Sequence, residues 1–344
     1  MEKSILEVRH VSIWFTQYER GTKRRSLPVI RDLNLTVGAG EVVAVVGASG
    51  SGKSLLAHGI LGILPYNSHM EGEILYGGEP LTKERAEKLR GNGLALIPQG
   101  VTYLDPLMKV GAQLTRGRKD QETKERCRQV LERYGLGPET ADLYPFELSG
   151  GMARRVLIAS AVMDESKLII ADEPTPGLDA RAAGRILGHF RELTEGGAGM
   201  LFITHDLELA LTIADRVVVF YAGETIEEAA AEDFQEEGRL RHPFTRALFR
   251  AMPSHGFAPI RGSQPYPAAP LPDSVRPARK SAARRTTFLY GRSEADWCAA
   301  CIRKRRKQYD AGSKKCDILL QREKEGAGAG PVQPVPGQRG TGGT

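Results

Sequence analysis

The sequence is poor in features that would indicate a membrane span or an oxidising compartment. It has 4 cysteines in 344 residues and 6% aromatic residues. No segment reaches about 18 consecutive apolar residues, the length that a membrane-spanning helix needs. Residues 1–7 lack the apolar core of a signal peptide. We therefore expect a cytoplasmic chain, a location in which disulfides are disfavoured.

Internal repeats and an even spread of charge are also absent. The content of 41% hydrophobic and 26% charged residues is typical of globular proteins. The net charge of +6 comes from residues 257–344, with 17 Lys+Arg against 7 Asp+Glu, whereas residues 1–256 have 31 against 35. Nothing in the first 256 residues predicts nucleic-acid binding. The basic run 303–307 is typical of a solvated face or a contact with anionic lipid.

A glycine-rich segment predicts a site for nucleotide phosphate. Residues 47–54 match G-x-x-x-x-G-K-[ST], between an apolar run at 41–46 and a helical pattern at 55–64. In this context Lys53 bridges the β and γ phosphates and the Ser54 hydroxyl is a ligand for Mg²⁺. A glycine-rich turn with an incidental lysine is the alternative, which this context disfavours. The predicted cradle consists of Gly47, Ser49, Gly50, Ser51, Gly52, Lys53 and Ser54.

Two further segments fit phosphate chemistry. The apolar run 167–171 ends in Asp172 and Glu173, which predicts one carboxylate for Mg²⁺ and one beside the attacking water. Residues 149–151 read Ser-Gly-Gly, 23 residues before Asp172, and precede a helical pattern at 152–162. A helix that starts there would direct its N-terminus at an anion.

These motifs, in this order, resemble the ATP-binding-cassette (ABC) ATPases, whose LSGGQ signature is similar to residues 148–152. The resemblance runs from residue 15 to residue 205 and implies roles for further residues. These are Gln99 in the Q-loop, Asp179 in the D-loop, His205 as the switch histidine, and Phe15 as the aromatic that stacks on adenine, with Trp14 less favoured.

The resemblance also implies a fold and a division of the chain. We expect an α/β P-loop NTPase core of the RecA-like type, with a mainly parallel sheet, an inserted α-helical subdomain and a largely irregular C-terminal extension. In residues 122–134 the apolar positions fall on one helix face, which Gly135 would close. The predicted parts are an ABC domain (1–256, with the helical subdomain at about 91–164), a proline-rich linker (257–288), a basic cysteine-containing extension (289–325) and a disordered tail (326–344).

In ABC ATPases the phosphate loop and the signature face opposite edges of one cassette, so the resemblance implies a head-to-tail dimer. ATP would lie between Lys53 and Ser54 of one subunit and residues 149–151 (Ser149, Gly150 and Gly151) of the other. Glu173 would act on water, His205 would contact the γ-phosphate, and Gln99 would contact Mg²⁺ and sense a membrane partner. The second subunit is either a related chain or another copy of this one.

Residues 99–114 and 241–253 resemble the oligopeptide, dipeptide and nickel importer subfamily. Residues 144–147 and 199–202 lean toward its nickel-type members. This implies a peripheral ATPase on the cytoplasmic face of a bacterial cell membrane, with two permease subunits and an extracellular substrate-binding lipoprotein as partners. The cargo would be nickel, metal complexes or short peptides. Two alternatives stay open: a cassette attached to a soluble enzyme complex such as carbon-phosphorus lyase, and a non-hydrolysing nucleotide-gated regulatory subunit.

The cysteines of the extension are a further candidate site. Cys298, Cys301 and Cys316 give C-x2-C and a third thiol. The subfamily's extension often carries cysteines that hold an iron-sulfur cluster in some members, although the spacing here differs. An iron-sulfur cluster, a zinc ion and three reduced thiols are the alternatives. Cys127 lies on the predicted helix face, which favours a core position.

Overall fold

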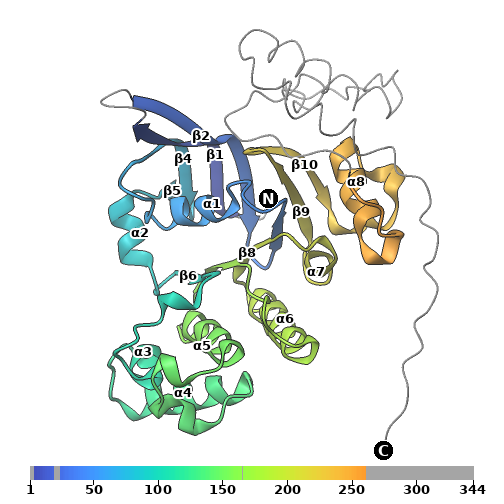
Figure 1. Cartoon of the computed structure of the whole chain (residues 1–344). Coiled ribbons are helices and arrows are strands. Elements are labelled where there is room, and N and C mark those ends of the chain that lie inside the picture. Colours follow the sequence, from blue (N-terminus) through green and yellow to red (C-terminus); the bar gives the residue numbers. More distant parts are fainter. Residues whose placement is uncertain (1–3, 19–23, 165, 261–344) are drawn as a thin grey trace, which may run out of the picture. The chain divides into compact units, whose positions relative to one another are not determined.

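The computed structural model describes residues 4–18, 24–164 and 166–260, all of which belong to one compact unit. Figure 1 shows two β-sheets above a lobe of helices. The chain leaves the sheet after β6 to form the lobe, and it re-enters the sheet at β7, after α5. The expected α/β class is confirmed.

The larger sheet has six strands in the order β10-β9-β3-β8-β7-β6. Every neighbouring pair is parallel except β10 and β9, which confirms the predicted mainly parallel sheet. The strand β3 consists of five buried aliphatic residues, as expected where helices or a second sheet cover both faces of the larger sheet. The strands are β3 (Val42–Val46), β6 (Leu94–Ile97), β7 (Leu168–Asp172), β8 (Gly199–Thr204), β9 (Arg216–Tyr221) and β10 (Glu224–Ala230).

The second sheet is antiparallel, in the order β2-β1-β4-β5. Alternating residues of its strands, such as Leu6, Val8 and Leu33, join the same buried cluster as Val43 of the larger sheet. One hydrophobic core therefore holds the two sheets together. The strands are β1 (Ser4–Tyr18), β2 (Arg24–Gly38), β4 (Ser68–Tyr76) and β5 (Glu79–Pro80).

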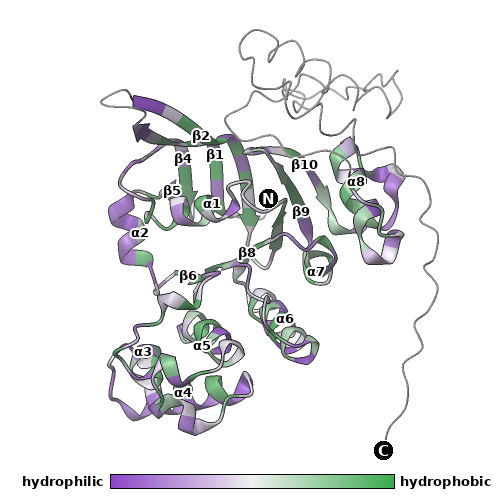
Figure 2. Cartoon of the chain, in the orientation of Figure 1, coloured by the Kyte–Doolittle hydropathy of each residue, from purple (hydrophilic) through white to green (hydrophobic). Residues whose placement is uncertain are grey.

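The helices cover the sheets and form the lobe. Figure 2 shows the difference in character: α2 is largely hydrophilic, whereas β9 is largely hydrophobic. The helices are α1 (Lys53–Ile60), α2 (Lys83–Leu89), α3 (Val110–Thr115), α4 (Gln121–Arg133), α5 (Gly150–Val162), α6 (Ala180–Glu195), α7 (Leu207–Leu211) and α8 (Pro243–Ala251). The predicted helix at 122–134 agrees with α4, and Gly135 follows it with φ +66°. The Cys127 side chain of this helix is buried, as the core interpretation expects.

Two predicted boundaries were wrong. The helix after the phosphate loop ends at Ile60 rather than at residue 64, because Gly62 adopts φ +66° and breaks the helix before the proline does. The helical subdomain also starts later than residue 91. Residues 94–97 form β6, a short apolar run that pairs in parallel with β7 and so belongs to the sheet.

The lobe is tied to α6 by polar contacts. Tyr134, at the end of α4, places its hydroxyl in hydrogen-bond contact with Nδ1 of His189 on α6, and both side chains are buried. Next to this pair, Arg133 forms a salt bridge with Glu192. Because α6 is the helix that follows β7, these contacts connect the lobe to the edge of the sheet at which β7 ends.

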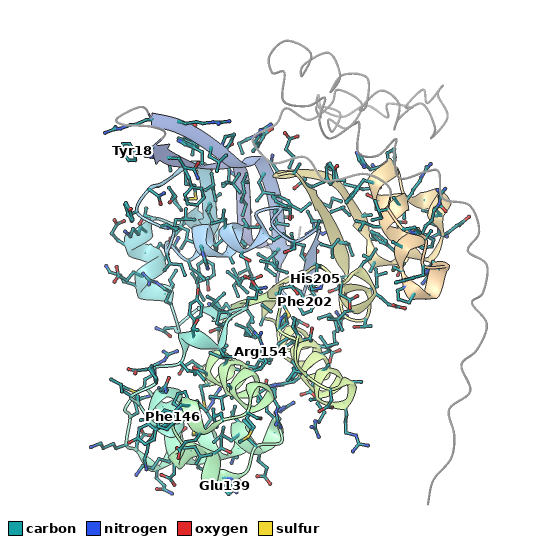
Figure 3. All side chains as sticks on the ribbon, viewed as in Figure 1. Tyr18, Glu139, Phe146, Arg154, Phe202 and His205 are labelled. Atoms are coloured by element: carbon teal, nitrogen blue, oxygen red, sulfur yellow. The ribbon has the colours of Figure 1, made fainter. Side chains whose placement is uncertain are left out.

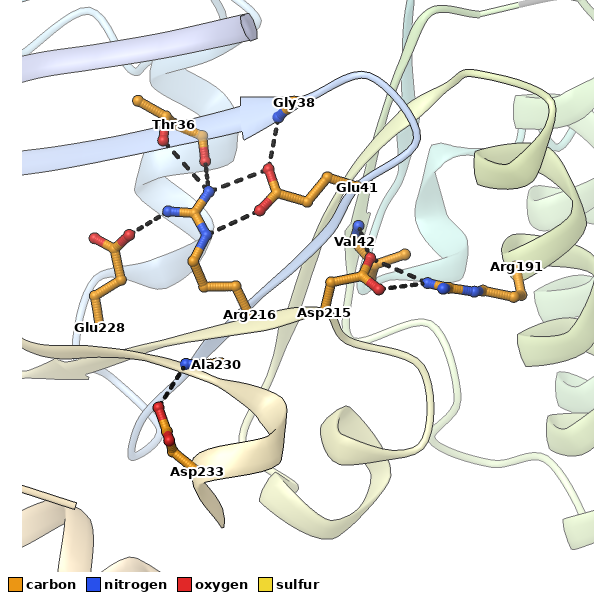
Figure 4. Close-up of polar contacts among 10 residues, drawn as sticks. All are labelled: Thr36, Gly38, Glu41, Val42, Arg191, Asp215, Arg216, Glu228, Ala230 and Asp233. Atoms are coloured by element: carbon orange, nitrogen blue, oxygen red, sulfur yellow. Dashed lines mark hydrogen bonds and ion pairs between the residues drawn. The ribbon is translucent and has the colours of Figure 1, made fainter. Parts of the chain in front are cut away.

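A second polar network lies at the start of β9 (Figure 4). The Arg216 guanidinium donates to Glu41 at 2.9 Å and to the Thr36 carbonyl at 2.7 Å, and it also pairs with Glu228. The neighbouring Asp215 accepts from Val42 N at 2.8 Å. These groups join β2, β3, β9 and β10 at the end of the large sheet where the parallel strands begin.

The predicted linker beyond residue 260, the cysteine-containing extension and the tail lie outside the described residues. Cys298, Cys301 and Cys316 are among them, so a metal or cluster there stays a prediction. In the part of the chain that is described, no helix is both long and apolar enough to cross a bilayer.

Candidate nucleotide site

Four predicted segments meet at one edge of the large sheet. The phosphate loop follows β3, the Gln99 loop follows β6, Glu173 follows β7, and His205 follows β8. The strands β3, β8, β7 and β6 are consecutive neighbours and parallel, so their carboxyl ends lie at the same edge. This is the edge at which ligands bind in open parallel sheets.

The phosphate loop needs glycine for two different reasons. At Gly47 a Cβ atom would lie 2.2 Å from the carbonyl oxygen of Phe220 on β9, so no side chain fits. Gly50 and Gly52 adopt φ values of +76° and +103°, a region that favours glycine. The loop therefore has the close packing and turns of a phosphate cradle.

Lys53 is buried at the start of α1. Its ammonium donates to the carbonyl oxygens of Gly47 at 2.7 Å and Ala48 at 3.0 Å, so it lies folded against the loop. Burial lowers the pKa of Lys53, and the charges of Glu173 and Asp172 oppose that shift. A positive charge is thus held where phosphate oxygens would enter.

The pair Asp172 and Ser54 suits a hard cation such as Mg²⁺. Asp172 is 4% exposed, and within the described residues its Oδ1 has no hydrogen-bond partner. Burial raises the pKa of Asp172, while a hydrogen bond from Ser54 lowers it. A buried carboxylate oxygen without a donor, beside a hydroxyl, supplies the oxygen ligands that Mg²⁺ prefers. Of the predicted magnesium residues, Asp172 and Ser54 therefore fit that ion, and the role of Gln99 stays a prediction.

Glu173 and His205 are in direct contact. Oε1 of Glu173 lies 2.7 Å from Nδ1 of His205, and the Thr204 hydroxyl donates to Oε2 at 3.4 Å. Glu173 is buried, whereas the His205 side chain is 60% exposed. Glu173 also has φ +48°, an unusual value for a residue other than glycine, and its N–H donates to the Ile203 carbonyl at 2.9 Å. The backbone thus fixes the carboxylate against the histidine.

The main chain of the Q-loop is held by a residue that the sequence motifs do not single out. Arg154 of α5 donates to the carbonyl oxygens of Pro98 at 2.8 Å and Gln99 at 2.5 Å. The Gln99 residue itself is exposed. Thr204 is likewise absent from the predicted set. No sequence motif marks Arg154 or Thr204, so only their contacts in the folded structure identify them.

The signature lies at the start of α5. Ser149 caps this helix by accepting from Met152 N at 3.3 Å, and Ser149 and Gly150 are exposed. Gly151 faces the D-loop, since a Cβ there would lie 3.6 Å from the Gly177 carbonyl oxygen. Asp179 caps α6 by accepting from Ala182 N at 2.8 Å. The structure therefore brings the signature next to its own D-loop.

The aromatic residues of β1 divide between the two faces of the strand. Trp14 stacks on His69, with ring centroids 5.6 Å apart. Phe15 lies on the same face as Ile13, whose Cδ1 atom lies 3.4 Å from where a Cβ on Gly59 of α1 would be. Phe15 therefore lies on the face of β1 that packs on α1, the helix that begins at the phosphate loop, and its stacking on adenine stays a prediction.

Comparisons with known proteins agree with this geometry. A family model described as "ABC transporter" matches residues 30–176. The oligopeptide transport ATP-binding protein OppD of Bacillus subtilis (strain 168) is 35% identical over 293 residues, which cover 81% of this chain and 80% of the relative. The chain belongs to the ABC transporter family. It is an ABC ATPase subunit, in which ATP hydrolysis is coupled to transport.

Other relatives agree with the predicted subfamily. OppD of Lactococcus lactis subsp. cremoris (strain SK11) is 37% identical over 266 residues, covering 73% of this chain and 77% of the relative. The dipeptide transport ATP-binding protein DppD of Haemophilus influenzae is 36% identical over 264 residues, covering 73% of this chain and 78% of the relative. The resemblance to the peptide branch of the importer subfamily is therefore confirmed.

Solved structures support the fold. A structure of the ATP-binding subunit of an ABC transporter matches with a TM-score of 0.58 at 27% identity, covering 71% of this chain and 98% of that chain. A dimeric post-hydrolysis cassette with bound ADP and phosphate matches with a TM-score of 0.58 at 26% identity, covering 66% of this chain and 98% of that chain. The predicted P-loop NTPase core is confirmed by these matches.

Proposed function

We propose that this chain hydrolyses ATP at a site shared between two cassettes and that this energises the import of short peptides. The observation that carries the proposal is the contact between Glu173 and His205, 2.7 Å apart at the strand edge where the phosphate loop begins. A buried carboxylate held by a histidine beside a phosphate cradle is suited to orienting a water molecule for attack on phosphorus.

The residues of the site divide the chemistry among them. Lys53 and the loop amides would bind the phosphates, and Ser54 and Asp172 would hold Mg²⁺, with Gln99 contacting it from the Q-loop. When bound, Mg²⁺ neutralises charge on the β and γ phosphates. Glu173 would orient or deprotonate water through its carboxylate, and Phe15 would stack on the adenine.

His205 has two proposed tasks that its position allows together. Its Nδ1 atom is engaged with Glu173, and its largely exposed ring leaves Nε2 available for the γ-phosphate. A contact between Nε2 of His205 and the γ-phosphate would make the orientation of the Glu173 carboxylate depend on the presence of that phosphate. Loss of that phosphate would then release both residues.

A second cassette would complete the site. The exposed Ser149 and Gly150 present the N-terminus of α5 to solvent, where the γ-phosphate of ATP on a facing subunit can bind. ATP would then join two cassettes head to tail, and hydrolysis would separate them. The facing subunit is a related chain or a second copy of this one.

The cargo is proposed from the relatives. Proteins named for oligopeptide and dipeptide transport match over most of the chain, which favours short peptides. The lean toward nickel-type members stays a prediction, as do metal complexes as cargo. The transport names of the relatives do not favour a carbon-phosphorus lyase partner or a non-hydrolysing regulatory role, the two alternatives that the sequence left open.

The proposed permease contact lies between β6 and α3. Apolar side chains are exposed there, with Leu107 at 86% and Tyr103 at 53%. This segment directly follows Gln99, so a permease helix that rests on it would adjoin the ATP site. Contact with two permeases would hold the chain at the cytoplasmic face of the cell membrane, the peripheral location that the sequence predicts. An extracellular binding lipoprotein would deliver the cargo to the permeases.

The test compares two substitutions in the assembled transporter. In Glu173→Gln the amide keeps the shape but loses basicity, so hydrolysis should fall by roughly 10² to 10⁴ while ATP binding remains. Purified without permeases and given ATP and Mg²⁺, this variant should elute from size exclusion as a stable dimer, larger than the nucleotide-free protein. In Lys53→Ala, both ATP affinity and dimerisation should weaken. Equal hydrolysis by wild type and Glu173→Gln would refute the proposed role of Glu173.

A further inference from the structure

We propose that Arg154 is a positioning residue that couples the two ATP sites of the dimer through one subunit. Its guanidinium holds the main chain of the Q-loop, which belongs to the subunit's own ATP site. Its backbone belongs to α5, whose N-terminus carries the signature that serves the opposite site. This inference rests on the head-to-tail arrangement proposed above.

The contact has the geometry of a rigid connection. Nη1 of Arg154 donates to the Pro98 carbonyl at 2.8 Å, and Nη2 donates to the Gln99 carbonyl at 2.5 Å. Arg154 is 7% exposed, so water does not compete well for these two bonds. Two donors in a fixed planar fork set the orientation of consecutive peptide groups, which a single ammonium cannot do.

Arg154 lies where the helical lobe meets the sheet, as Figure 3 shows. It is five residues from Ser149, the residue that caps α5. A helix moves as a unit over such a distance, because its backbone hydrogen bonds hold successive turns together. A shift of the Q-loop on binding nucleotide would therefore pull on α5 and change the position of Ser149 and Gly150.

The charge environment supports a single stable position for the guanidinium. Burial lowers the pKa of Arg154, and the nearby charges of Asp172 and Glu173 oppose that shift. Arg154 stays cationic because the guanidinium of arginine is effectively always protonated in proteins.

Its neighbour Arg155 provides a matched control. Arg155 donates to the carbonyl oxygens of Tyr134 at 3.0 Å and Gly135 at 2.7 Å, and to Gly151 at 3.2 Å. These contacts stay within the lobe and do not reach the Q-loop. The substitutions Arg154→Lys and Arg155→Lys each keep the positive charge and replace the planar guanidinium with an ammonium. Only Arg154→Lys breaks the proposed connection between α5 and the Q-loop.

The test is hydrogen exchange of the full chain with and without ADP and Mg²⁺, at a concentration where size exclusion shows a monomer. In wild type, nucleotide should change exchange both in the phosphate loop and at the first amides of α5, the latter by about fivefold or more. In Arg154→Lys the phosphate-loop change should persist while the change in α5 is lost. In Arg155→Lys both changes should persist.

The outcomes separate the two proposals. An α5 response in Arg154→Lys equal to that of wild type, or no α5 response in wild type, would overturn the role of Arg154 while leaving nucleotide binding intact. No phosphate-loop response in wild type would instead refute the proposed nucleotide site. Arg154→Met, which removes charge and fork together, should lose the α5 response as well, so a retained response there also contradicts the inference.

Discussion

The buried pair formed by Tyr134 and His189 predicts that acid loosens the joint between the helical lobe and α6. Burial, with a smaller contribution from the charge of Arg133, lowers the pKa of His189 from 6.5 to about 4. The folded protein thus favours the neutral ring. The stability that this preference contributes is fully present above about pH 6.5 and is lost as pH falls toward 4.

The size of the effect follows from the shift. For a fully shielded group, a fall in pKa from 6.5 to about 4 corresponds to about 3 kcal/mol of unfolding free energy. Solvent screening around the ring reduces this, so we expect roughly 1.5 kcal/mol between pH 7.5 and pH 4. Other groups titrate in the same range, and a comparison with the variant His189→Gln removes their contribution.

The assay is urea unfolding of wild type and His189→Gln, followed by circular dichroism at both pH values. Wild type should lose about 1.5 kcal/mol more than His189→Gln on acidification. Tyr134→Phe keeps the titrating ring and its burial, and so should retain most of the pH dependence of wild type. Equal acid losses in wild type and His189→Gln would refute the reasoning, because the ring would then titrate alike in the folded and unfolded chain.

Two further predictions concern the phosphate loop and the exposed apolar segment. Gly47→Ala should displace the loop from Phe220 and lower ATP affinity more than tenfold by equilibrium binding, whereas Gly188→Ala, in open space on α6, should leave it unchanged. Leu107→Asp should abolish permease-stimulated ATPase activity but leave ATP binding intact, and normal stimulation would contradict the proposed docking segment. Asp105 is less suitable for this test, because its carboxylate accepts from Leu107 N at 2.9 Å and shapes the turn.

The sequence predicted those parts of the fold that have strong local signals. The apolar runs at 41–46 and 167–171 and the helix at 122–134 each have a clear apolar pattern, and they agree with β3, β7 and α4 of the structure. The extent of β1 and β2, 15 residues each, was not predictable, because pairing between the two strands extends them beyond their apolar residues. Tertiary pairing decides such ends, as it decides that residues 94–97 belong to the sheet.

For the site, the sequence indicated the residues but not their contacts. Glu173 and His205 are 32 positions apart, and only the parallel pairing of β7 with β8 brings them to one edge. Arg154 has no motif that marks it, because its role depends on two backbone carbonyl groups that carry no sequence information. The Asp172 carboxylate was predicted as a magnesium ligand, and its burial without a partner at Oδ1 is the physical condition that suits it to an ion.

The D-loop has an unusual backbone conformation just before Asp179. Gly177 adopts φ +80°, a value that alanine tolerates poorly. The Gly177 carbonyl also lies against Gly151 of the signature, so the unusual backbone is located at the contact between these two segments. The glycine at 177 therefore allows the D-loop to follow a path close to α5.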